Sequence, residues 1–171
     1  LIGFDNTKPD FGVEELLDRM GFLPDKFLLL LSSIDFINLH RGCEEEYELD
    51  PFYCSYAGHP NGDEHAIQRW TNLQLKGLVE VLHRKGVKVF PGFFDFHIPE
   101  HSFFDAHPEL YATIWCDGTL STAGFIYMTK RLADGTYYED FFLQKAVEVL
   151  RDYGFDGIHL PDGICRPRLP L

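Results

Sequence analysis

Two carboxylates in this 171-residue chain each follow a short apolar segment that we predict to be a buried strand. Asp162 comes just after the segment 155–160, and Asp95 comes just after 87–94. Two carboxyl groups at one edge of a sheet can work as a pair, with one donating a proton to a leaving group and the other acting as nucleophile or activating water. Asp162 is therefore our candidate for the principal acid, and Asp95 for the second. The structural alternatives are an Asp-Gly turn at Asp162 and a loop ordered by backbone hydrogen bonds at Asp95.

Three histidines, His40, His97 and His159, lie at or near the ends of predicted strands. Imidazole nitrogens can bind sugar hydroxyls, so we predict a substrate-binding role for all three. A second interpretation is a metal site completed by Asp162 or Asp95, because imidazole and carboxylate suit zinc or manganese. Their scattered spacing matches no metal motif, so no metal or other cofactor is predicted. The structural alternative is that each histidine is packed and hydrogen-bonded.

Arg41 directly follows His40, and its planar guanidinium carries a fork of donors that suits a carboxylate or a sugar oxygen. We therefore predict that Arg41 contributes to substrate binding. Its structural alternative is an ion pair with one of the three glutamates at 44–46.

Aromatic residues are concentrated in the two long connections that follow the first two predicted strands. Aromatic rings pack against the apolar faces of sugars, and their polar tips bind hydroxyl groups. We expect Trp115 to be such a platform, whereas most of the other rings are expected to form small cores inside the loops. The rings in these two connections are Tyr47, Phe52, Tyr53, Tyr56, Phe103, Phe104, Tyr111 and Trp115.

The four cysteines are too few for a disulfide scaffold at this length, and none belongs to a Cys-x-x-Cys pair. They are Cys43, Cys54, Cys116 and Cys165. We expect unpaired thiols, with a Cys43–Cys54 bridge or a four-thiolate site as the alternatives.

Three short segments have the composition of buried strands, at 34–40, 87–94 and 155–160. Each is rich in apolar residues and ends in polar residues, Gly or Pro. The segment 27–31 is ambiguous between a strand and a buried helix. Asp156 lies at the amino end of the third segment and is expected to have a structural role.

Helical periodicity predicts a short helix at 13–20 and two longer amphipathic helices at about 64–84 and 138–153. Asn61 or Asp63 could cap the start of the second helix. A glycine follows each helix, in the position where a left-handed residue ends helices.

Helix, glycine and strand follow one another in nearly the same way at 83–89 and 151–157. Such tight connections favour parallel strands with right-handed crossovers. The strand-to-helix connections at 41–63 and 95–137 are far longer, and a further strand is possible near 125–128. In α/β folds the carboxyl ends of the strands, where these long loops gather, are where ligands bind.

Four stretches resemble segments of TIM-barrel glycoside hydrolases, in which a GFDGIH strand follows an amphipathic helix and carries an acidic residue at its carboxyl end. The stretches are FINLHR at 36–41, HRKGVKVFPGF at 83–93, HPEL at 107–110 and YGFDGIHLPDG at 153–163. The resemblance implies a parallel-stranded α/β fold of the (β/α)₈ type and a hydrolase of O-glycosyl bonds, with Asp162 as its acid. Such proteins often carry paired acids after this strand, whereas Asp162 follows a proline here.

A closed (β/α)₈ barrel usually needs about 250 residues. We therefore expect residues 1–171 to be a single domain that forms the N-terminal portion of a larger barrel. The first residue, Leu1, is not a methionine, which agrees with a piece of a longer product. An incomplete barrel exposes an unpaired strand and apolar helix faces, which favours self-association.

The chain is acidic: 15 Lys and Arg against 27 Asp and Glu give a formal net charge of −12. Such a chain repels a phosphate backbone, so a nucleic-acid partner is not expected. Its apolar runs fall short of the roughly 18 residues that span a bilayer, so a membrane partner is not expected either. We expect a glycoside hydrolase-like protein that cleaves or binds a carbohydrate. The alternatives are a non-catalytic carbohydrate-binding or assembly module and a metal-dependent hydrolase.

Overall fold

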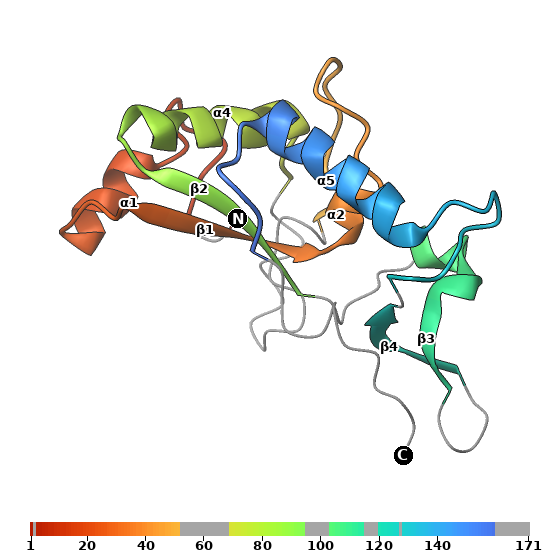
Figure 1. The fold of residues 1–171 in the computed structure, drawn as a ribbon. Coiled ribbons are helices and arrows are strands. Elements are labelled where there is room, and N and C mark those ends of the chain that lie inside the picture. The colour runs from red at the N-terminus through yellow and green to blue at the C-terminus, as the bar shows by residue number, and fades with distance from the viewer. Residues whose placement is uncertain (2, 52–68, 95–102, 115–119, 127, 160–171) are drawn as a thin grey trace.

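Two parallel strands form the centre of the fold, and α4 and α5 cover the same side of them (Figure 1). The computed structural model describes residues 1, 3–51, 69–94, 103–114, 120–126 and 128–159. The elements in chain order are α1 (Val13–Met20), β1 (Lys26–Ser33), α2 (Asp35–Asn38), α4 (Asn72–Arg84), β2 (Lys88–Phe94), the 3₁₀ turns η2 (Phe103–Asp105) and η3 (Pro108–Leu110), β3 (Tyr111–Ile114), β4 (Leu120–Ile126) and α5 (Tyr138–Tyr153).

The parallel pairing of β1 with β2 confirms the predicted strand direction. Leu28 faces Phe90 and Leu30 faces Gly92 in the register of this pair. The predicted third strand, 155–160, forms one parallel bridge in its described part, between His159 and Gly92. The α/β class is thus confirmed in its coarse form, and the described residues form a small open sheet and no closed barrel.

The first strand of the parallel sheet is β1, which precedes the segment 34–40 where we predicted it. The segment 34–40 was expected to be a strand, but α2 occupies its centre and β1 contains the ambiguous segment 27–31. The hydroxyl of Ser33 accepts a hydrogen bond from the Asp35 N–H at 3.1 Å, which turns the chain out of the sheet. All four residues of α2 are buried, including the polar Asp35 and Asn38, so the apolar residues of this short segment resemble those of a buried strand.

The strand expected near 125–128 belongs to a separate hairpin. β4 pairs with β3 in antiparallel fashion, so this strand lies within the long second connection and does not extend the parallel sheet. A single short connection is sufficient for antiparallel strands, whereas a parallel neighbour needs a crossover.

α1 and α5 have the predicted bounds, and both end where a glycine takes a left-handed conformation. Gly154 has φ 77°, a value that a residue with a Cβ adopts only at a cost. The second long helix begins later than the expected start at about 64, because Arg69 and Trp70 are not helical, and the expected caps Asn61 and Asp63 lie outside the described residues. Thr71 caps α4 instead.

A capping box fixes the start of α4. The Thr71 hydroxyl accepts from the Gln74 N–H at 3.1 Å, and the Gln74 side chain accepts from the Thr71 N–H at 3.0 Å. The pattern Thr-x-x-Gln is a sequence signal for such a cap. We missed it because Trp70 is apolar and fitted the inner face of the longer helix that we predicted.

Asp156 fixes the amino end of β2, which agrees with the structural role expected for it. Oδ2 of Asp156 accepts the Val89 N–H at 2.7 Å and lies 2.9 Å from Nε2 of His83. The segment after α5 is thereby tied to both β2 and the last turn of α4.

Replacing Asp156 by Ala is expected to lower the free energy of unfolding by about 1–3 kcal/mol, because the Val89 N–H loses its charged acceptor. Urea denaturation measures this loss. His83→Gln is the control, since it removes only the partly exposed ring and leaves the Val89 bond in place. A loss in Asp156→Ala no larger than that in His83→Gln would contradict the structural role.

In the described ranges, no helix combines the length and apolar character that crossing a membrane requires.

Candidate functional site

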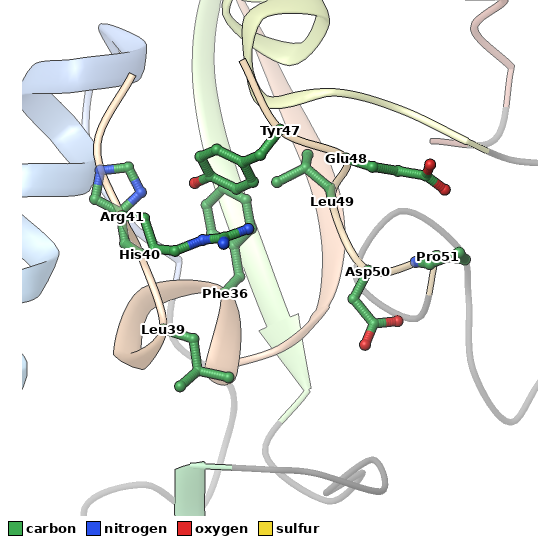
Figure 2. Close-up of a pocket in the computed structure, with 9 residues that line it drawn as sticks. All are labelled: Phe36, Leu39, His40, Arg41, Tyr47, Glu48, Leu49, Asp50 and Pro51. Atoms are coloured by element: carbon green, nitrogen blue, oxygen red, sulfur yellow. The ribbon is translucent and has the colours of Figure 1, made fainter. Parts of the chain in front are cut away.

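A pocket of about 660 Å³ lies at the carboxyl end of β1, where the chain passes through α2 into the first long connection (Figure 2). One wall comes from α2 and the three residues after it, and the other comes from the segment 47–51. The lining residues are Phe36, Leu39, His40, Arg41, Tyr47, Glu48, Leu49, Asp50 and Pro51.

The wall at 47–51 is held by the residues just before and within the first turn of α4. Glu48 forms an antiparallel bridge with Thr71. The Leu49 N–H donates to the Trp70 carbonyl at 2.8 Å, and the Asn72 N–H donates to the Tyr47 carbonyl at 3.0 Å. Extended pairing with the base of a capped helix gives this loop wall a fixed position.

Asn72 connects this wall to the chain that precedes it. Its side chain is fully buried. Its Oδ1 accepts the Tyr47 N–H at 2.9 Å, while its Nδ2 donates to the carbonyls of Glu45, at 2.9 Å, and Gly42, at 3.3 Å. Sequence reasoning missed Asn72, because a polar residue in the first turn of a helix is normally exposed.

His40 forms the buried base of the opposite wall. Its side chain is 1% exposed, and its Nε2 lies 2.9 Å from Oδ2 of Asp152 on α5. The Nδ1 atom is buried and has no hydrogen-bond partner among the described residues. The ring also packs against Tyr153, with the two ring centroids 5.5 Å apart. The Lys145 ammonium donates to the His40 carbonyl at 3.1 Å, which further anchors this wall to α5.

Asp152 is ionised in this pair at neutral pH. Burial alone would raise its pKa, but hydrogen bonds from His40 and Arg151 outweigh that effect, and the pKa of Asp152 lies below its ordinary value of 3.8. An ionised carboxylate only accepts hydrogen bonds, so Nε2 of His40 carries a hydrogen here. The pair locks the ring of His40 against α5.

Replacing Asp152 by Asn is expected to lower the free energy of unfolding at pH 7 by about 1–3 kcal/mol, because buried His40 loses a charged partner. A carboxyl whose folded pKa is depressed stabilises the fold above its unfolded pKa, and loses that effect as pH falls through the folded value. The difference between the two proteins should therefore shrink below about pH 4.

Thermal unfolding of both proteins between pH 3 and 7 measures this difference. Arg151→Gln is the control, since Arg151 is largely exposed and its ion pair with Asp152 should contribute little. A difference between Asp152→Asn and the unchanged chain that stays constant with pH would contradict the assignment.

Arg41 and Tyr47 face each other from the two walls. The guanidinium carbon of Arg41 lies 4.1 Å from the centre of the Tyr47 ring, a cation–π contact. Figure 2 shows the side chain of Arg41 extending from its wall toward the segment that carries Leu49. Across the pocket, Glu48 is ion-paired with Arg69 at 3.0 Å.

Of the predicted site residues, the structure brings His40 and Arg41 together in this pocket. His159 is exposed, bonds through its backbone N–H to the Pro91 carbonyl at 2.9 Å, and does not line the pocket. Four further predicted site residues lie outside the described residues: Asp95, His97, Trp115 and Asp162.

The loop aromatics that the structure describes divide between the pocket and local packing, and the place of Tyr47 in the pocket was not predicted. Tyr47 lines the pocket, whereas Phe103 stacks on Phe141 with ring centroids 5.1 Å apart. Phe104 packs edge-on against Tyr138 at 5.9 Å, which confirms a loop core anchored on α5.

Cys43 is a free thiol, so the Cys43–Cys54 bridge is not formed. Burial raises the pKa of Cys43, so its thiol is protonated at neutral pH. The other three cysteines lie outside the described residues. Among the residues that are described, no group of three or more His, Cys, Asp or Glu side chains is arranged to hold a metal ion.

Comparisons of the chain with family models, curated proteins and solved structures found no match.

Proposed function

We propose that this chain is a glycoside hydrolase-like protein that binds a carbohydrate in the pocket at the carboxyl end of β1. The observation that carries the proposal is the composition and position of the pocket. It is built by the first strand-to-helix connection of a parallel sheet, which is where α/β enzymes hold their ligands.

The lining residues have the chemistry that sugars require. Leu39, Leu49 and Pro51 offer apolar contacts to the C–H faces of a sugar ring. Arg41 offers hydrogen-bond donors, and carboxylates on the facing wall offer acceptors for hydroxyl groups. A volume of about 660 Å³ is large enough for a short oligosaccharide.

Cleavage of the bound sugar is assigned to carboxylates that follow the later strands. Asp162 remains our candidate for the principal acid and Asp95 for the second carboxyl group. Both lie outside the described residues, so their roles stay proposals drawn from the sequence.

Titration calorimetry and hydrolysis assays of the full chain test this function, with a panel of cello-, xylo-, manno- and galacturono-oligosaccharides. We expect binding that Tyr47→Ala weakens about 10-fold, because it removes the ring that supports Arg41. Tyr137→Ala is a matched control, since Tyr137 also lies under an arginine, Arg131, at 3.8 Å and does not line the pocket. Hydrolysis should be lost in Asp162→Asn.

One observation favours a second candidate, a carbohydrate-binding module without catalysis. Among the described residues, the pocket carboxylate of Glu48 is ion-paired with Arg69, and a paired carboxylate suits hydroxyl binding better than acid or base chemistry. Binding of an oligosaccharide by the full chain without any turnover would establish this module. Failure of every oligosaccharide to bind would contradict both candidates.

A further inference from the structure

The guanidinium of Arg41 is held in place without being neutralised. It stacks on Tyr47 at 4.1 Å, and among the described residues no hydrogen bond or ion pair of its nitrogens is found. The structural alternative for Arg41, an ion pair with one of the glutamates at 44–46, is not formed. The face of the guanidinium is thus occupied by a ring, while its N–H edges stay open to the pocket.

Three acidic side chains in the segments near Arg41 are bonded to other groups. Glu46 accepts the Thr71 hydroxyl at 2.7 Å, and Glu48 pairs with Arg69 at 3.0 Å. Asp152, beside the neighbouring His40, is bonded to that ring and to Arg151. Arg41 therefore lines the pocket without an ion pair to any described carboxylate.

The wall across from Arg41 carries acidic residues. Glu48 and Asp50 line it, and carboxylates accept hydrogen bonds from hydroxyl groups. Figure 2 shows Glu48 and Asp50 on the wall across from His40, with the side chain of Glu48 directed away from Arg41. A plain anion would satisfy Arg41 alone, whereas a ligand that carries both an anionic group and hydroxyls satisfies both walls.

We propose that the pocket takes an acidic sugar, whose carboxylate or sulfate binds the guanidinium edge of Arg41 and whose hydroxyls bind the facing wall. The inference rests on the proposed carbohydrate function and narrows it to a ligand class. Arginine binds carboxylate and sulfate-like groups through two parallel hydrogen bonds, which a lysine cannot reproduce.

The test compares charged and uncharged forms of the same sugars by titration calorimetry on the full chain. The probes are trigalacturonic acid and its methyl ester, and a sulfated galactan oligomer before and after desulfation. The first pair reports carboxylate recognition, and the second pair reports sulfate recognition. Arg41→Gln and Arg41→Lys are compared with the control Arg131→Gln, which alters the other arginine–tyrosine stack.

At least one charged probe is expected to bind about 10-fold or more tightly than its uncharged form. Arg41→Gln should abolish that preference, Arg41→Lys should restore it only in part, and Arg131→Gln should leave it unchanged. Added salt should weaken the charged probe selectively.

Equal affinity for charged and uncharged forms, or a preference that survives in Arg41→Gln, would overturn the inference while leaving the carbohydrate function intact. Absence of binding by all four probes and by the neutral oligosaccharides would overturn both.

Discussion

Replacing Tyr138 by Ala is expected to lower the free energy of unfolding by about 3–5 kcal/mol. Tyr138 opens α5, is fully buried, and packs against Phe104 and Phe142 with ring centroids 5.9 and 6.0 Å apart. Its hydroxyl donates to Oδ1 of Asn38 at 3.0 Å, which ties α5 to α2. Truncation would leave a cavity, an unsatisfied buried amide and a loosened pocket wall.

Urea denaturation followed by circular dichroism measures the loss. Tyr138→Phe removes only the hydroxyl and should cost about 1–2 kcal/mol, which separates the hydrogen bond from the packing. Leu143→Ala, on the same helix but with a side chain that is 60% exposed, should change stability by less than about 0.5 kcal/mol. A loss in Tyr138→Ala as small as that in Leu143→Ala would contradict the proposed packing.

Asn72→Ala is expected to have the second largest effect, a loss of about 2–4 kcal/mol. The substitution removes three hydrogen bonds at once and leaves the Tyr47 N–H without its acceptor. The wall at 47–51 should loosen, so the amide of Tyr47 should exchange its hydrogen faster with solvent. Sugar binding in the pocket should weaken along with it.

Hydrogen exchange observed by NMR, together with urea denaturation, checks this second expectation. Leu73→Ala is the matched control, because Leu73 is the next residue of α4 and is 38% exposed. Unchanged exchange of the Tyr47 amide in Asn72→Ala would show that the wall is held by something other than Asn72.

Much of the fold could be predicted because its signals are local. The amphipathic period and the C-terminal glycine define α1 and α5. The Gly and polar residues on either side of an apolar run define β2. The first strand was misplaced because 26–33 and 34–40 are both short and apolar. Pairing with β2, far along the chain, and the Ser33–Asp35 hydrogen bond decide between them.

The candidate site could likewise be predicted only in part. His40 and Arg41 could be identified from their place after an apolar segment. Their partners could not, because Asp152 is 112 residues from His40 and becomes its neighbour only when α5 packs beside α2. Asn72 is buried by a loop that returns to the base of α4, and no spacing rule in the sequence indicates such a return.

Mapping of a bound oligosaccharide by NMR chemical shifts tests the central claim most directly. The full chain, labelled with ¹⁵N, is titrated with each oligosaccharide of the panel. We predict that the amides between Phe36 and Pro51 shift with a bound sugar, whereas those of α1 and the β3–β4 hairpin do not. Shifts confined to residues remote from this pocket, or no shift with any oligosaccharide, would contradict a carbohydrate site at the carboxyl end of β1.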